Sequence, residues 1–153
     1  MIQSFREDMI HKYMYLNKKT ATKTDGRLEE VGLHRGQPVL LHLLWEKDGL
    51  SGRELSDLME VQPATVTKMV RRLKTTGFVK TKQDPKDSRI SRVYLTDQGK
   101  GVESQVKDIF RDLENIMFKG FTSDQRGQFH GFLDQIRENL GSSKEEEKVD
   151  KNE

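Results

Sequence analysis

Cysteine is absent from the chain, and histidine occurs only four times in 153 residues. Without thiols the protein can form no disulfide bond, hold no thiolate-bound metal and sense no oxidant through a cysteine. The histidines are scattered and include no His-x-x-x-His pair, so a metal switch would require His34, His42 and carboxylates to converge in the fold. We therefore expect no metal and no other cofactor.

Long hydrophobic runs and catalytic motifs are also missing. Charged residues interrupt the first 19 residues throughout, which argues against a secretory signal peptide or a membrane-spanning helix there. There is no Gly-rich phosphate-binding loop, and no histidine lies in a recognisable nucleophile or acid–base motif. These absences predict a cytoplasmic protein with no enzymatic activity and no contact with a membrane.

Apolar residues are scarce for a chain of this length. They make up 33% of the sequence, against 34% for charged residues. That proportion gives a thin core for a monomer, but it suffices when two subunits bury apolar faces against each other. The expected organisation is one compact subunit that forms a homodimer.

Positive charge is concentrated in one segment. Residues 62–92 contain nine Lys or Arg and only two Asp, a local charge of +7, whereas the whole chain carries +2. A concentrated basic block is the electrostatic footprint of a surface that binds a polyanion. A solvated charged face is the alternative interpretation of this block taken alone.

Apolar residues recur at steps of three and four in several segments, which predicts amphipathic helices. The expected helices cover residues 2–19, 37–47, 51–59, 63–76, 96–117 (with Thr96 as N-cap) and 123–140. Residues 20–35, with Gly26 and Gly32 and no clear period, are expected to form a loop or a broken helix. Residues 142–153 are charged and nearly free of apolar side chains, which predicts a disordered tail.

Two short helices joined by a tight turn span the start of the basic segment. Ser51 can cap the first helix, and Glu54 three residues later completes a capping box. Pro63 can occupy the first turn of the second helix, where its missing N–H is not needed. Two β-like runs, residues 78–82 and 92–95, follow and flank a polar tip. Two helices followed at once by a β-hairpin describe a winged helix-turn-helix.

The second helix of this pair has an outward face without acidic residues. Its apolar stripe points one way, so Ala64, Lys68 and Arg71 lie on the opposite side. A small residue with hydroxyls and cations suits a helix in the DNA major groove, where side chains meet bases and phosphates. Gln62 and Thr65, near the helix start, are best placed to reach base edges. The residues predicted to contact DNA here are Gln62, Pro63, Ala64, Thr65, Thr67, Lys68, Arg71 and Arg72.

The hairpin tip has the sequence DPKDSRISR, in which Asp84 and Pro85 start a turn. Asp87 is close enough to Arg89 to hold its guanidinium by a charge-assisted hydrogen bond. A held arginine on a narrow β-tip can enter a minor groove, where the potential is most negative. The wing residues predicted to contact DNA are Lys86, Asp87, Ser88, Arg89 and Arg92, and Ser51 and Arg53 are expected at the DNA backbone.

The string Asp-Pro-x-Asp-x-Arg-x-x-x-Val-x-Leu-Thr-x-x-Gly, with the segment from Ser51 to Gly77 before it, resembles the core of the MarR family over about residues 33–101. Carried over by position, the family's wing arginine falls on Arg89, with Asp87 as its supporting carboxylate. The resemblance implies a mainly α fold with a small β-hairpin wing. The implied regions are a winged helix-turn-helix at 33–96 (helix-turn-helix about 51–76, wing about 78–95) and helical dimerisation regions at 1–32 and 97–141.

The resemblance also implies a homodimeric repressor on double-stranded DNA, released from a pseudo-palindromic operator by a ligand or another signal. Many relatives bind small aromatic or amphipathic molecules between the dimerisation helices and the DNA-binding lobe. The candidates to line such a site are Phe5, Tyr13, His34, Arg35 and Trp45, although aromatic residues at helical spacing are usually core. The alternatives are a metal-responsive regulator and a winged-helix module that binds protein instead of DNA. The second would show acidic or apolar replacements on the outward helix face, and none occurs.

Overall fold

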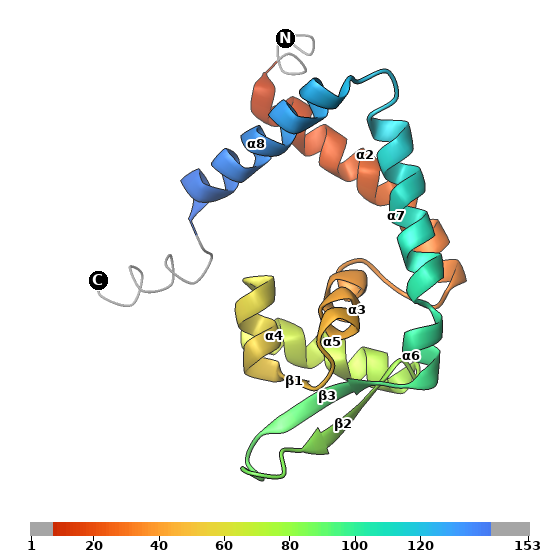
Figure 1. The fold of residues 1–153 in the computed structure, drawn as a ribbon, viewed down its shortest axis with the longest axis vertical. Coiled ribbons are helices and arrows are strands. Elements are labelled where there is room, and N and C mark those ends of the chain that lie inside the picture. The colour runs from red at the N-terminus through yellow and green to blue at the C-terminus, as the bar shows by residue number, and fades with distance from the viewer. Residues whose placement is uncertain (1–7, 142–153) are drawn as a thin grey trace.

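The computed structural model describes residues 8–141, which form a lobe at one end of a helical stalk (Figure 1). The elements in chain order are α2 (Met9–Glu30), α3 (Gln37–Glu46), β1 (Leu50–Ser51), α4 (Gly52–Met59), α5 (Pro63–Thr75), β2 (Val79–Gln83), β3 (Ser91–Leu95), α6 (Asp97–Gly101), α7 (Glu103–Met117) and α8 (Ser123–Leu140). The lobe contains α3, α4, α5 and the small sheet, and the stalk consists of α2 and α7. Helix α6 leads from the lobe into α7, and α8 lies at the other end of the stalk.

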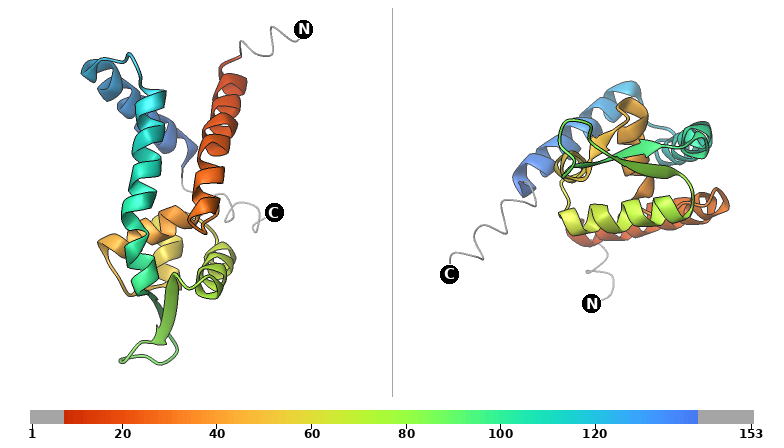
Figure 2. Two further views of the ribbon diagram at one scale, coloured as in Figure 1. Left: turned by 90° about the vertical axis from the view of Figure 1, so that its right-hand side faces the viewer. Right: turned by 90° about the horizontal axis from the view of Figure 1, so that it is seen from below.

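The lobe is a winged helix-turn-helix, as the sequence predicts. Its antiparallel sheet has the strand order β1-β3-β2, with Leu50 opposite Val93 and Val79 opposite Leu95. Leucines of α3 and α4 and apolar residues of α5 and the sheet make one continuous core. This core fixes α5 and the hairpin to the same support, and the hairpin extends beyond it as a wing (Figure 2). The sequence pattern does not predict β1, because two residues are too few to show an alternation.

The loop or broken helix expected at residues 20–35 is wrong over most of that length, because α2 continues without a break to Glu30. Leu28 and Thr24 are buried, and Arg27 forms an ion pair of 3.0 Å with Asp112 of α7. Packing against α7 therefore outweighs the weak helix propensity of the threonines and of Gly26, which misled the sequence interpretation. The part of the first helix predicted before residue 8, including Phe5, and the predicted tail 142–153 lie outside the described residues.

The C-terminal helices begin where the sequence predicts. The Thr96 hydroxyl accepts a hydrogen bond of 3.1 Å from the Gly99 amide, which confirms Thr96 as a cap. The single helix predicted after it is divided into α6 and α7 at Val102. Helix α8 starts at Ser123, and its cap is Thr122, which forms a capping box with Gln125.

A close contact joins the lobe to the stalk at α6. A Cβ atom on Gly99 would lie 2.1 Å from the carbonyl oxygen of Phe78, so only glycine fits there. The Trp45 indole N–H donates to the carbonyl oxygen of Gly99 at 2.9 Å. These two contacts fix the direction in which α7 leaves the lobe.

The stalk and α8 carry most of the exposed large apolar side chains. Helix α8 contains no buried residue, and Phe132 and Leu140 are among its exposed side chains. No helix within residues 8–141 is long and apolar enough to cross a membrane. The division of the chain into a dimerisation region and a DNA-binding region remains a prediction.

Candidate nucleic-acid interface

The turn between α4 and α5 is fixed by hydrogen bonds at both ends of α4. The Ser51 hydroxyl accepts from the Glu54 amide at 3.2 Å, and a Glu54 carboxylate oxygen accepts from the Ser51 amide at 2.8 Å, which confirms the predicted capping box. At the other end the buried Ser56 hydroxyl donates to the carbonyl oxygen of Val61 at 2.7 Å. Glu60, in the left-handed region at φ 53°, turns the chain toward α5. Sequence analysis missed Ser56, whose role depends on a backbone group beyond the end of its own helix.

Helix α5 buries Val66 and Leu73 and exposes the opposite face, as predicted. It contains no acidic residue, and Arg72 and Lys74 lie in its last turn. The Thr67 hydroxyl donates to the carbonyl oxygen of Pro63 at 3.0 Å, which ties this exposed side chain to its own helix. The predicted DNA-contacting residues of this helix are exposed, except for the half-buried Gln62: Pro63, Ala64, Thr65, Thr67, Lys68, Arg71 and Arg72.

The wing tip is a tight turn organised by Asp84. One of its carboxylate oxygens accepts from the backbone amides of Lys86 at 2.7 Å and Asp87 at 3.1 Å. The Asp84 amide donates to the carbonyl oxygen of Ile90 at 2.8 Å, which closes the tip. The pKa of Asp84 is lowered, first by the hydrogen bond from Arg92 and then by these two amides. The tip therefore has a defined shape before any ligand binds.

Arg89 is held by Asp87, as the sequence predicts. Its Nε and Nη2 atoms each lie 3.0 Å from a different carboxylate oxygen of Asp87, which is a bidentate pair. This pair lowers the pKa of Asp87 and raises that of Arg89. The Arg89 side chain is nevertheless 88% exposed, so its outer edge remains available to a ligand.

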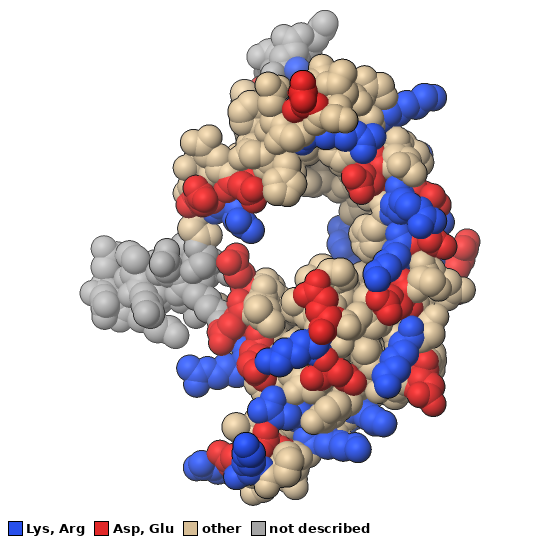
Figure 3. Space-filling view, in the orientation of Figure 1, with Lys and Arg blue, Asp and Glu red and all other residues tan. Residues whose placement is uncertain are grey.

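A groove of about 840 Å³ lies between α5 and the wing. It brings together five residues predicted to contact DNA: Ser51, Arg53, Thr67, Arg71 and Arg89. Lys74 and Ile90 line the same groove, although the sequence analysis did not assign them to the interface. The other predicted contacts, among them Lys68 and Lys86, do not line it. In the space-filling view, Lys and Arg side chains gather over the wing end of the molecule (Figure 3).

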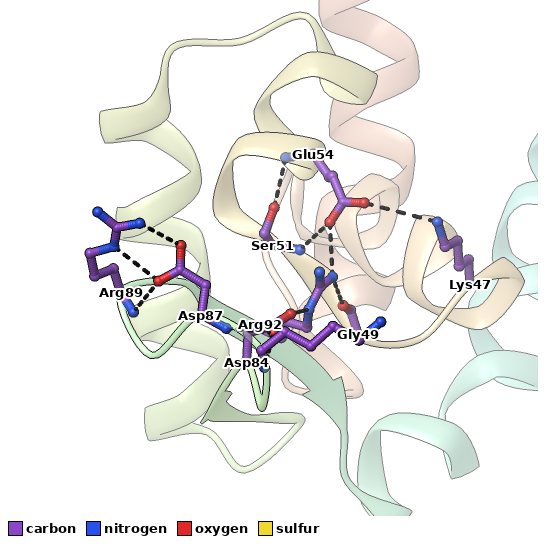
Figure 4. Close-up of polar contacts among 9 residues, drawn as sticks. Lys47, Gly49, Ser51, Glu54, Asp84, Asp87, Arg89 and Arg92 are labelled. Carbon is purple, nitrogen blue, oxygen red and sulfur yellow. Dashed lines mark hydrogen bonds and ion pairs between the residues drawn. The ribbon is translucent and has the colours of Figure 1, made fainter.

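Arg92 occupies a different environment from Arg89 (Figure 4). It lies on β3 at the base of the wing, and its side chain is only 29% exposed. Its guanidinium pairs with Asp84, with Glu54 at 3.2 Å and with the carbonyl oxygen of Gly49 at 2.9 Å. These contacts join the wing tip, α4 and the turn before β1.

The residues predicted to bind an effector are not gathered in one place. Trp45 lines a second groove, of about 420 Å³, between α3 and α7. Tyr13, His34 and Arg35 do not line this groove. Tyr13 is exposed on α2, and Arg35 pairs with Asp25 at 2.5 Å, which lowers the pKa of that carboxyl.

The same groove contains residues that the sequence analysis did not single out. Its walls include Val39, Phe110, Lys107 and Arg111, contributed by α3 and α7. Within residues 8–141, no group of three or more His, Asp or Glu side chains is arranged to hold a metal ion.

Comparison with known proteins assigns the lobe to a family. Residues 33–91 match the model of the MarR family. The repressor IacR of Pseudomonas putida is 31% identical over 101 residues, which are 66% of this chain and 60% of that protein. The crystal structure of a MarR transcriptional regulator from Methanosarcina mazei Go1 is 30% identical, covers 82% of this chain and 91% of that one, and has a TM-score of 0.74.

A further solved structure shares the fold and contains DNA. It is a cysteine-to-serine variant of MarR from E. coli complexed with operator DNA, 22% identical, with a TM-score of 0.75 over 86% of this chain and 96% of that one. The matched residues 33–91 hold the helix-turn-helix, β2 and the wing tip, and they end at Ser91, the first residue of β3. This chain is therefore a DNA-binding, winged helix-turn-helix transcriptional regulator that belongs to the MarR family.

Proposed function

We propose that this protein is a cytoplasmic homodimeric repressor without catalytic activity, which binds a pseudo-palindromic operator and is released from it by a small aromatic or amphipathic ligand. The observation that carries the proposal is the groove between α5 and the wing. Arg53, Arg71 and Arg89 reach this groove from α4, α5 and the wing, and α5 adds no acidic residue. A rigid concave surface with cations on three sides complements the phosphates that border a DNA groove. The relative IacR, a repressor, supports the direction of regulation.

The exposed face of α5 is proposed to lie in the major groove. Gln62 and Thr65, at its N-terminal end, would read base edges, as helix-turn-helix proteins do with the start of their second helix. Lys68, Arg71 and Arg72 would divide between guanine edges and phosphates. Pro63, Ala64 and Thr67 would contribute close apolar contact.

The wing is proposed to enter the adjacent minor groove with Arg89, braced by Asp87. Lys86 and Ser88 at the tip, and Ser51 and Arg53 at the start of α4, would contact the sugar–phosphate backbone. These contacts position the protein and carry the salt dependence, whereas α5 carries the base preference.

A homodimer is proposed because, within residues 8–141, the stalk and α8 leave large apolar side chains exposed. An isolated helix of 18 residues with no buried side chain has little stability of its own in water. The apolar residues of α8 share one face, and α2 adds exposed Met9, Ile10 and Tyr13. Dimerisation regions at 1–32 and 97–141 would cover these faces and leave the lobe at 33–96 to contact DNA.

The second groove is the proposed effector site. Trp45, Phe110 and Val39 give it apolar walls. Lys107, Arg111 and Glu114 of α7 also line it, with Lys107 paired to Glu103 and Arg111 to Asp108. Apolar walls with a few charged groups suit a small amphipathic aromatic molecule. Trp45 also donates to Gly99, so a ligand against the indole ring would act on the contact between lobe and stalk.

Selection of DNA sites from a random pool, followed by a fluorescence anisotropy titration with the selected duplex, tests the proposal. We expect a two-fold symmetric site with half-sites about one helical turn apart and a steep loss of affinity with added salt. Equal affinity for the selected duplex and for random DNA at moderate salt would contradict a specific repressor.

A further inference from the structure

The Arg92 guanidinium joins three elements that the sheet alone connects weakly. Strand β1 pairs with β3 over only two residues, Leu50 with Val93 and Ser51 with Arg92. Beyond that pairing the wing is a two-stranded ribbon, which is flexible without other support. Arg92 lies where the ribbon leaves the sheet, at the level of Asp84 and opposite Glu54 of α4 (Figure 4).

The surroundings of Arg92 make it a poor ligand for DNA. The carboxylates of Asp84 and Glu54 surround its positive charge, and Glu54 also pairs with Lys47 at 3.9 Å. Two cations and two carboxylates give the cluster no net positive charge to present to a phosphate. Nε and Nη1 are already used, on Asp84 and on Glu54 with the Gly49 carbonyl oxygen. The Arg92 guanidinium is charged at every pH at which the protein folds, and its hydrogen bond to Asp84 raises its pKa further.

Arg89 shows the contrast on the same hairpin. One edge of its guanidinium pairs with Asp87, and the side chain is 88% exposed, against 29% for Arg92. Arg89 is therefore built to meet a ligand, and Arg92 to hold the structure that presents it.

We propose that Arg92, with Asp84 and Glu54, is a positioning residue that fixes the wing against α4 and acts on DNA affinity through Arg89, without contacting DNA itself. This inference rests on the proposed function, because it assumes that Arg89 contacts DNA. It replaces the direct DNA contact that the sequence predicts for Arg92.

Two isosteric variants distinguish a positioning role from a purely electrostatic one, because the two roles predict opposite changes in DNA affinity. In Glu54→Gln the amide oxygen still caps the Ser51 amide, and in Asp84→Asn it still accepts from the amides of the tip, but each loses its charged pairing with Arg92. Each variant also removes a negative charge next to a DNA-binding surface. Coulomb attraction alone therefore predicts tighter binding to DNA, whereas positioning predicts weaker binding.

The experiment measures affinity for a duplex of about 30 base pairs, selected by the wild-type protein from a random pool, at fixed salt. We expect both variants to bind about 5-fold or more weakly. Asp97→Asn, at the exposed start of α6 directly after β3 and outside the contacts of Arg92, makes the matched charge change and should bind as tightly as wild type or slightly better. Equal or tighter binding by both Glu54→Gln and Asp84→Asn would overturn the proposal.

A double-mutant cycle tests whether Arg92 acts through Arg89. Arg92→Ala should weaken DNA binding in the wild-type protein but should weaken it by less than about 2-fold more in an Arg89→Ala background. In hydroxyl-radical footprints of Arg92→Ala, protection of the DNA at the wing site should disappear, while protection at the α5 site remains. A full additional loss in the double variant would mean that Arg92 contacts DNA directly. Failure of the proposed function looks different, because then Arg89→Ala itself would leave affinity unchanged.

Discussion

Trp45 of α3 and Gly99 of α6 meet in a hydrogen bond of 2.9 Å between the indole N–H and the backbone carbonyl oxygen, although 54 positions separate them in the sequence. Gly99 is also in contact with the carbonyl oxygen of Phe78, which allows no side chain at that position. The lobe that carries α5 and the wing is thus joined to the stalk through one small, tightly packed region. Changes to these contacts should therefore alter both the stability of the protein and the orientation of the lobe relative to the stalk.

Gly99→Ala should destabilise the protein strongly. The new Cβ would lie 2.1 Å from the Phe78 carbonyl oxygen, a distance that forces the backbone of α6 or of the residue just before β2 to move. We expect a loss of about 3 kcal/mol in the free energy of unfolding by urea denaturation. Gly101→Ala is the matched control, because nothing lies within 4 Å of its Cβ position. That variant should be neutral or more stable by up to about 1 kcal/mol, and a similar loss in both variants would contradict the steric explanation.

Trp45→Phe should remove the hydrogen bond while it keeps most of the apolar contact. The Gly99 carbonyl oxygen then lacks this donor, which costs about 1 kcal/mol in the free energy of unfolding. If the second groove is the effector site, an aromatic carboxylate such as benzoate, used as a probe, should release DNA less well from this variant than from the parent. Unchanged unfolding and unchanged release would show that the hydrogen bond is incidental.

Arg89→Ala should weaken binding to the selected duplex by about 1–3 kcal/mol and leave the dimer intact. Its guanidinium is held in place by Asp87 before DNA arrives, so little ordering is required on binding.

Lys68→Ala should instead lower the slope of affinity against salt by about one unit, if the lysine contacts a phosphate. Anisotropy titrations over a salt series measure both effects, and Lys119→Ala, in the connection between α7 and α8, serves as the control cation. Loss of dimer or fold in Arg89→Ala would assign that arginine a structural role.

The sequence predicts the site better than the stalk, because the contacts that shape the site join residues close together in the sequence, whereas those that shape the stalk do not. The Ser51–Glu54 capping box and the Asp87–Arg89 pair each join residues two or three positions apart, so their spacing is visible in one dimension. The length of α2 depends on its packing against α7, and helix propensities of neighbouring residues contain no information about that contact.

The same limit explains the assignment of Arg92. Charge and position placed it in the basic face of the wing, but its partner Glu54 lies 38 positions away. A pattern of residues in one segment contains no information about a carboxylate contributed by another. Trp45 shows the same limit, because only the fold places its indole N–H against Gly99.

Phe132→Asp should dissociate the proposed dimer. Phe132 is 61% exposed on α8, where it shares a face with Phe129, Leu133 and Ile136. A dimer buries this side chain twice, so a charge there costs at least about 3 kcal/mol of association energy, more than a hundredfold in the dissociation constant. Glu138→Gln, on the opposite side of α8 by helical spacing, changes the charge of the helix away from this face and should leave the dimer intact. Sedimentation velocity distinguishes the species, and an unchanged dimer in Phe132→Asp would place the interface elsewhere.

Acid should loosen the wing before it unfolds the lobe. The pKa values of Asp84, Asp87 and Glu54 are all lowered in the folded protein, by hydrogen bonds from Arg92, from Arg89 and from the Ser51 backbone respectively. A carboxyl with a lowered folded pKa contributes stability above its unfolded pKa, about 4, and loses that contribution as the pH falls through the folded value. The backbone amides of Lys86 and Asp87 donate hydrogen bonds to the Asp84 carboxylate. Their hydrogen exchange, corrected for the intrinsic rate, should therefore accelerate below about pH 4. In Asp84→Asn, which does not titrate there, protection should be lower at neutral pH and should change less with acid. Equal pH dependence in the parent and the variant would show that Asp84 does not control the tip.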